Sequence, residues 1–278
     1  MLDHFTIKPG AGFPDHPHRG QETITYLLKG AVDHEDFAGN AGTIEAGDLQ
    51  FMTAGKGIMH AEMPRQNPDG SANVGMQLWV DLPEKLKKCE PRYRDLRARE
   101  IPNIDVDEGK VHIKIISGQS HGVDSVQELA YTPVWILDIE IKPGGKVQQP
   151  LPAGWNAFAY TLSGSTAFGV GSDKTIVGQF HNVVFEQKGD EVFAEVEADA
   201  KENGHFSKSH GLSLLSYSGS CISKWTRLAY VGGICPKFGK TRAQPRCLQV
   251  TVLLKIPPSE RGAKKSFSDL GKEQKESS

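Results

Sequence analysis

Short runs of alternating apolar and polar side chains recur through the first 210 residues of the chain. Met76–Leu82 alternates in this way, as a strand with one buried face does. Thr23–Leu28 is rich in β-branched and aromatic residues and ends at the turn signal Lys29-Gly30, which is typical of a strand. Other strands are predicted at residues 43–48, 49–52, 111–116 and 134–141, with a charged connector over residues 84–108. The pattern predicts an all-β protein.

The strand pattern repeats once along the chain. Ala159–Gly164 matches Thr25–Gly30 in its strand-then-glycine order, and Lys188-Gly-Asp190 matches Ala46-Gly-Asp48. Two weak copies of one β-unit predict two barrels or sandwiches in tandem. The alternative is that Gly-Asp turns recur by chance, because such turns are frequent in any β protein.

Composition narrows the class of protein. The 278 residues are 38% hydrophobic and include 30 glycines and 16 prolines, which suits short strands joined by turns. A formal net charge of −2 predicts neither a nucleic-acid nor a membrane partner. No apolar run approaches the roughly 18 residues of a spanning helix, and no signal-peptide pattern follows Met1. Four cysteines without metal-like spacing favour a reducing, intracellular compartment.

The charge is unevenly distributed along the chain. Residues 1–210 carry 20 Lys and Arg against 30 Asp and Glu, a net charge of −10. Residues 211–278 carry 12 against 4, a net charge of +8, and hold three of the four cysteines. Such a shift marks a boundary. We expect residues 211–278 to form an atypical, basic and poorly ordered tail.

Two pairs of metal-ligand residue types stand at strand spacing. His16 and His18 are two residues apart, as are His60 and Glu62, so each pair shares one face of an extended chain. If the two strands are neighbours, three imidazoles and a carboxylate converge and leave open positions on a six-coordinate metal. Imidazole with carboxylate suits Fe(II), Mn, Ni, Cu or Zn rather than Mg or Ca. The alternative for the first pair is a surface turn, because Pro14 and Pro17 disfavour a central strand.

The remaining candidates are weaker. His34 precedes two acidic residues in a turn-like stretch and is interpreted as a solvated turn residue. Arg19 and Lys56 flank the two ligand pairs and could attract an anionic substrate to a pocket mouth, although solvated surface charge is the simpler interpretation. The other histidines have no partner at ligand spacing and are interpreted as ordinary polar residues.

Several blocks resemble the signature segments of the pirin family of cupins. The blocks are Phe13-Pro-Asp-His-Pro-His-Arg-Gly20, His34-Glu-Asp-Phe37, Gly47-Asp-Leu-Gln50, Met52-Thr-Ala-Gly-Lys-Gly-Ile-Met-His-Ala-Glu-Met-Pro64, Gln77-Leu-Trp-Val80, Ile115-Ile-Ser-Gly118 and Pro152-Ala-Gly-Trp155. The likeness covers roughly residues 1–210. Both ends depart from the family pattern: the chain begins inside it, and the tail is unrelated to it. We expect both departures to come from gene-model errors.

The resemblance implies a bicupin of two tandem antiparallel β-barrels, jelly-roll-like, over residues 1–108 and 109–210. It implies iron in the first barrel alone, with His16, His18, His60 and Glu62 as ligands. In the wider cupin superfamily the glutamate of the first motif, here Glu22, is often a ligand. The pirin pattern favours Glu62 and leaves Glu22 as a residue supporting the ligands. Pro150 and Pro152 stand at the corresponding positions of the second barrel, where we expect no metal site.

The resemblance implies two functions. One is an Fe(II)-dependent dioxygenase of the quercetin 2,3-dioxygenase type, acting on a flavonol and O2, with Glu62 as the proton acceptor. The other is a non-enzymatic, iron- and redox-sensitive co-regulator of NF-κB-type transcription factors, in the nucleus or cytoplasm. The net charge of −10 over residues 1–210 argues against direct contact with nucleic acid. A third possibility is a degenerate protein damaged by its altered ends.

Overall fold

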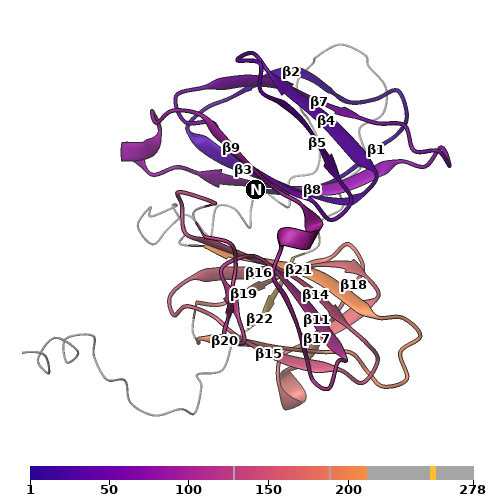
Figure 1. Cartoon of the computed structure of the whole chain (residues 1–278). Coiled ribbons are helices and arrows are strands. Elements are labelled where there is room, and N and C mark those ends of the chain that lie inside the picture. Colours follow the sequence, from indigo (N-terminus) through magenta and orange to yellow (C-terminus); the bar gives the residue numbers. More distant parts are fainter. Residues whose placement is uncertain (128, 188, 212–250, 255–278) are drawn as a thin grey trace, which may run out of the picture.

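The computed structural model of the chain describes residues 1–127, 129–187, 189–211 and 251–254, and its regular structure is almost entirely β-strand. The strands gather in two units, drawn one above the other in Figure 1: β1 to β9 form the N-terminal unit, and β10 to β22 form the C-terminal unit. Helical segments in the described ranges are three-residue 3-10 turns, and none is long and apolar enough to cross a membrane.

The N-terminal unit consists of two antiparallel sheets that face each other, with strand orders β1-β8-β3-β6-β9 and β2-β7-β4-β5. Its elements are β1 (Leu2–Ile7), β2 (Phe13–His18), β3 (Gln21–Lys29), β4 (Ala31–Asp36), β5 (Ala41–Glu45), β6 (Leu49–Thr53), β7 (Ile58–Pro64), β8 (Asn73–Asp81), η1 (Glu84–Leu86), β9 (Arg92–Leu96) and η2 (Ala98–Glu100). Apolar side chains from both sheets meet at one end, where Phe5 and Leu27 pack against Val32 and Ile44.

The C-terminal unit has a sheet of order β10-β11-β14-β21-β16-β19-β22, a sheet of order β15-β20-β17-β18, and the short hairpin β12-β13. Its elements are β10 (Asn103–Val106), β11 (Val111–Ser117), β12 (Gln119–Ser120), β13 (Val123–Asp124), β14 (Val134–Ile141), β15 (Lys146–Pro150), β16 (Asn156–Ser163), β17 (Ser165–Phe168), η3 (Gly171–Asp173), β18 (Thr175–Gly178), β19 (Asn182–Phe185), β20 (Glu191–Glu195), β21 (Gly204–Gly211) and β22 (Thr251–Leu254). All pairings are antiparallel except that of β22 with β19.

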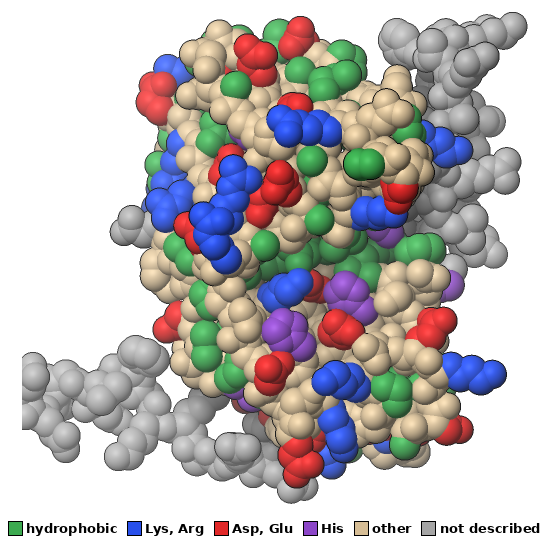
Figure 2. Space-filling model, turned by 45° about the vertical axis from the view of Figure 1, so that its right-hand side comes forward, with side chains coloured by type: hydrophobic (Ala, Val, Ile, Leu, Met, Phe, Trp, Pro, Cys, Tyr) green, Lys and Arg blue, Asp and Glu red, His purple; other side chains and the backbone are tan. Residues whose placement is uncertain are grey.

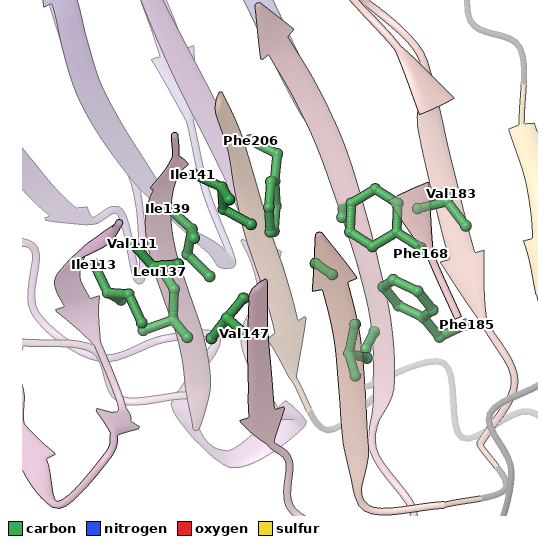
Figure 3. Close-up of a cluster of buried hydrophobic side chains, with 14 of the residues drawn as sticks. Val111, Ile113, Leu137, Ile139, Ile141, Val147, Phe168, Val183, Phe185 and Phe206 are labelled. Atoms are coloured by element: carbon green, nitrogen blue, oxygen red, sulfur yellow. The ribbon is translucent and has the colours of Figure 1, made fainter. Parts of the chain in front are cut away.

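An apolar core fills the C-terminal unit. Figure 3 shows Ile139 and Phe206 from the large sheet directed toward Val147 and Phe168 of the facing sheet. Phe168 is fully buried, and its ring contacts the rings of Phe185 and Phe206 edge-on. Each large apolar side chain taken out of water stabilises the fold by about 1.5–3 kcal/mol. The interior of this unit therefore contributes stability.

The internal repeat predicted from the sequence is visible in the topology. The order β1-β8-β3-β6 corresponds to β14-β21-β16-β19, and β2-β7-β4-β5 corresponds to β15-β20-β17-β18. The matching strands β3 and β16 both end in a glycine with positive φ, 89° at Gly30 and 63° at Gly164. A β-carbon at Gly30 would collide with Asn73, and one at Gly164 with Asn203. Both turns therefore require glycine, and the fold is a pair of tandem cupin-like β-sandwiches.

Residues 84–108, predicted to be a charged connector between strands, contain two strands of their own. It contains β9, which pairs with β6, and β10, which pairs with β11. Both strands lie at the outer part of their sheets, where one backbone edge faces solvent. Charged residues are common on such edges because they discourage pairing with other chains. The many charged residues of this segment therefore obscured the apolar–polar alternation by which strands were predicted.

The two units share an apolar interface formed by the outer faces of their large sheets. Ile24 and Leu78 of the N-terminal unit join one buried cluster with Ile116 and Ile136 of the C-terminal unit. Figure 2 shows hydrophobic side chains in the middle of one face of the molecule, with charged side chains above and below them. The interface fixes the outer face of β3, whose inner face borders the candidate site.

The predicted domain boundaries at residues 108 and 210 stay predictions. In the structure β10, which precedes residue 108, pairs with β11 of the C-terminal unit. The predicted poor order of residues 211–278 falls outside the described residues, except for Gly211 and Thr251–Leu254.

Candidate metal centre

Strand β2 carries the first histidine pair along the edge of its sheet. It pairs with β7 alone, and its register shifts between Phe13 and His16. An edge strand with such an irregularity tolerates the prolines that a central strand would not. His16 lies opposite His60 of β7. The two predicted ligand pairs therefore lie on neighbouring strands and face the same interior.

Three imidazole rings converge at this point. The ring centroids lie 4.9 Å apart for His16 and His18, 4.5 Å for His16 and His60, and 5.1 Å for His18 and His60. One nitrogen from each ring lies within 4.8 Å of the others. His18 and His60 are buried, whereas the side chain of His16 is 30% exposed. The cluster is thus closed on one side and open at His16.

The hydrogen bonds of these rings leave nitrogens free to bind a metal. His16 Nδ1 lies 2.9 Å from the carbonyl oxygen of Pro14, which it can reach as an N–H donor. His18 Nδ1 lies 2.8 Å from the side-chain amide of Gln21. Within the described part of the chain, Nε2 of His18 and both ring nitrogens of His60 are buried without a partner. Buried polar atoms are rarely left unpaired, so these orphaned nitrogens fit a bound cation.

Burial keeps the imidazoles of His18 and His60 neutral. Burial, reinforced by the charge of His16, lowers the pKa of His18 to about 4. Burial and the neighbouring His16 and His18 lower the pKa of His60 to about 3. A metal ligand must offer a lone pair rather than a proton, so near neutral pH these rings are in the form that binds metal.

Glu62 stands beside the three rings on β7. Its Oε2 lies 3.8 Å from Nε2 of His16 and 3.9 Å from Nε2 of His60. Burial raises the pKa of this carboxyl, against the lowering effect of His16 and of a hydrogen bond from Gln77. The structure therefore brings all four sequence-predicted ligands together, with the carboxylate next to the imidazole cluster.

Gln77 and Trp79 of β8 complete this environment, and the sequence analysis did not place them in it. The amide nitrogen of Gln77 lies 3.4 Å from Oε1 of Glu62, and the Trp79 indole N–H donates to Gln77 Oε1 at 2.5 Å. The Trp79 ring meets His18 edge-on, with centroids 5.5 Å apart. Gln77 and Trp79 are two residues apart in an alternating strand, so the sequence indicates that their side chains share one face. It does not indicate that this face meets Glu62 and His18.

Glu22 does not take the predicted supporting position. Its Oε1 accepts hydrogen bonds from the Thr53 hydroxyl at 2.8 Å and the Tyr131 N–H at 2.9 Å, and its Oε2 accepts one from the Thr132 N–H at 3.1 Å. Gly20, with φ of 66°, separates β2 from β3, so Glu22 stands on a different strand from His16 and His18. The buried carboxylate therefore ties the N-terminal unit to residues 131–132 of the C-terminal unit.

His34 is also misplaced by the sequence interpretation. It is a buried residue of β4, opposite Glu62 of β7, rather than a solvated turn residue. Its Nε2 lies 3.3 Å from Asp95 Oδ2, and its ring stacks on Tyr93 at a centroid distance of 5.9 Å. The acidic residues that follow it suggested a turn, although alternation within the strand buries His34 and Asp36 and exposes Glu35.

An open hollow of about 630 Å³ lies on the outer face of the sheet at β2 and β7. It is lined by Pro17, His18, Arg19, Phe37, Gly57, Ile58 and Met59. Lys56, the other cation expected near the mouth, forms an ion pair with Glu90 at 2.6 Å and does not line the hollow. Pro17 and Met59 lie opposite each other on the two strands and are both exposed, so the hollow faces away from the three imidazoles. Nε2 of His18 is buried and is not reached from it.

Solved structures with this fold include an enzyme named for a reaction. The crystal structure of quercetin 2,3-dioxygenase from Acinetobacter baumannii is 26% identical, superposes with a TM-score of 0.65, and is matched over 82% of this chain and 83% of that one. The architecture of tandem antiparallel β-sandwiches is therefore shared with a protein of that name.

Sequence relatives give the family. The Pirin family matches residues 2–80, and the Pirin C-terminal cupin domain matches residues 136–205. A pirin-like protein of Solanum lycopersicum is 48% identical over 184 residues, which are 66% of this chain and 61% of that protein. Human pirin is 43% identical over 207 residues, 74% of this chain and 68% of that protein. The chain thus spans about three fifths of the tomato relative's length. On these matches, the chain belongs to the pirin family of the cupin superfamily.

Proposed function

We propose that the chain binds one Fe(II) ion through His16, His18, His60 and Glu62, and that it is a dioxygenase of quercetin-type flavonols. The supporting observation is the convergence of three imidazoles and one buried carboxylate, with ring nitrogens of two histidines left without partners. Three nitrogens and one oxygen leave open positions on a six-coordinate ion, and Fe(II) accepts this donor set. The likeness to a structure titled quercetin 2,3-dioxygenase favours a flavonol substrate.

The residues around the ion would orient the ligands and move a proton. Bound Fe(II) would supply the redox chemistry that lets O2 react with an organic substrate. His18 binds through Nε2 in this scheme, so Nδ1 carries the proton, and Gln21 turns its amide oxygen toward it. The Glu62 carboxylate would accept the hydroxyl proton of a flavonol.

The surrounding side chains serve this proton transfer. Gln77 donates to the Glu62 carboxylate, while Trp79 holds the Gln77 oxygen, so the carboxylate keeps its orientation. Both atoms of O2 end in the organic products of a dioxygenase, so the reaction requires no external reductant.

The test is oxygen uptake by protein loaded anaerobically with ferrous ion and then supplied with quercetin. Wild type should hold about one iron and consume O2. Glu62→Gln should keep its fold and lose turnover by about 100-fold or more, since general base catalysis contributes that much. His112→Ala, which changes a half-buried histidine paired with Asp105 in the C-terminal unit, should behave as wild type. Unchanged turnover in Glu62→Gln would remove its proposed role.

The co-regulator function remains a prediction from the resemblance, together with its nuclear location and NF-κB-type partners. The same experiment separates it from the enzyme. Stoichiometric iron without any flavonol-dependent O2 uptake would favour the co-regulator. A folded wild-type protein that binds no metal would overturn both functions.

A further inference from the structure

Phe13 lies on the open side of the imidazole cluster. The side chain of His16 is 30% exposed, whereas His18 and His60 are buried. The Phe13 ring meets the His16 ring edge-on, with centroids 6.3 Å apart. A ligand that approaches the cluster on its exposed side therefore meets Phe13 as well as His16.

A bulge in β2 turns Phe13 toward the cluster. Phe13 and His16 are three residues apart, so in a regular strand their side chains would point to opposite faces. Phe13 lies opposite Glu62 and His16 lies opposite His60, so β2 covers with three residues what β7 covers with two. The extra residue restores a shared face, because directly opposed side chains of antiparallel strands lie on the same face. Glu62 and His60 point inward, and Phe13 points to the same side.

The opposite sheet supports the Phe13 ring from its other side. Phe13 meets Phe5 of β1 edge-on, with centroids 6.1 Å apart, and Phe5 belongs to the apolar cluster at one end of the unit. Strands β1 and β2 are the edge strands of the two facing sheets. Phe13 therefore lies between these edges, with apolar side chains on one side and the imidazoles on the other, and 39% of it stays exposed.

Exposed aromatic surface beside a metal site favours one class of ligand. Apolar area gains free energy when a ligand covers it, and a second aromatic ring packs well on Phe13 in an edge-to-face or offset arrangement. The ion at His16 would hold the oxygens of such a ligand, while Phe13 contacts the rings that adjoin them. A chelating group without adjoining rings would be held by the ion alone.

We infer that Phe13 is a specificity-determining residue, which selects ligands whose metal-binding oxygens adjoin a flat aromatic ring system. The inference rests on the proposed function, because it takes the ion held by His16 as the anchor of the substrate. It adds the residue that recognises the rings of that substrate.

The test compares two ligands with the same chelating group: 3-hydroxyflavone, and maltol, which has the hydroxypyrone ring without the aromatic rings. Binding to zinc-loaded protein is measured under argon by calorimetry, so that no turnover is needed. Wild type should bind 3-hydroxyflavone at least about tenfold more tightly than maltol. Phe13→Ala should reduce this preference about 5- to 10-fold, through weaker binding of 3-hydroxyflavone alone, because an aromatic contact and its buried area are lost. Phe13→Tyr, which keeps the ring, should retain the preference.

Phe37→Ala is the matched control, because it removes a ring that is 71% exposed at the outer hollow. It should leave the affinities of both ligands unchanged. Equal affinities of the two ligands for wild type, or an unchanged preference in Phe13→Ala, would overturn the inference while leaving the proposed function in place. Equal weakening of both ligands in Phe13→Ala would also overturn it, since Phe13 would then only hold His16 in position. If neither ligand binds to loaded wild type, the proposed function fails together with the inference.

Discussion

The two units share one strand order, but their interiors differ in polarity. In the N-terminal unit, β7 directs His60 and Glu62 inward, whereas β20, its counterpart in the C-terminal unit, directs Val192 and Ala194 inward. The counterpart of the histidine-bearing β2 is β15, whose buried residues are Val147 and Gln149. Pro150 ends β15 and is exposed, and Pro152 lies beyond the strand, so neither is among its buried residues. The absence of a metal site in this unit stays a prediction.

The comparison shows that a cupin-like sandwich does not dictate what its interior holds. Strand pairing satisfies the backbone in both units, so the inward side chains are free to serve either packing or chemistry. Polar groups buried without partners cost free energy, and the unpaired nitrogens of His18 and His60 represent such a cost. The interior of the C-terminal unit is filled with hydrophobic side chains.

The largest expected effect tests the apolar interior. Phe168→Ala removes a fully buried ring that packs on Phe185 and Phe206. We expect the free energy of unfolding to fall by about 3–5 kcal/mol, measured by urea titration, because the lost contacts leave a cavity. Ile176→Ala, in which the replaced side chain is 68% exposed, should cost less than about 0.5 kcal/mol. Similar losses in both variants would contradict the assigned core.

The next effect tests the polar interior. Ferrous ion at about 100 times its dissociation constant should raise the free energy of unfolding of the wild type by about 2.7 kcal/mol, because it binds the folded state. His60→Ala should lose this stabilisation, since the removed imidazole is the most buried of the three. Thermal unfolding under argon, with His112→Ala as the control, measures the difference. A full metal-induced shift in His60→Ala would exclude this residue as a ligand.

The smallest effect concerns the interface between the units. Asp138 accepts a hydrogen bond from the Tyr26 hydroxyl at 2.9 Å, and its Oδ1 lies 2.5 Å from Nε2 of His205. Burial acts to raise the pKa of Asp138, but His205, Lys114 and Tyr26 outweigh it and leave the pKa lowered. Burial acts to lower the pKa of His205, but Asp138 outweighs it and leaves the pKa raised.

A raised histidine pKa stabilises the fold fully below the unfolded value of about 6.5, and this contribution is lost as pH rises through the folded pKa. The lowered pKa of Asp138 stabilises above its unfolded value of about 3.9 and is lost in acid. The difference in urea midpoint between wild type and His205→Gln should therefore be larger at pH 6 than at pH 9. A difference that grows as pH rises would contradict the assigned pair.

Local pattern alone predicted several of the strands and the two candidate ligand pairs. Alternation over Met76–Leu82 predicted β8, and the spacing of His16 with His18 and of His60 with Glu62 placed each pair on one face, because side chains alternate along any strand. The pirin-like blocks identified the family. These inferences depend only on residues close together in the sequence, so they could be made without knowing the tertiary structure.

Only the tertiary structure decided which faces meet. The turn at Gly20 sends Glu22 to the interface instead of the ligand cluster, and strand pairing buries His34 opposite Glu62. The pairing of Lys56 with Glu90 leaves Arg19 as the cation at the hollow. Each outcome depends on contacts between segments far apart in the chain, and one residue of register or one turn reverses the face that a side chain presents.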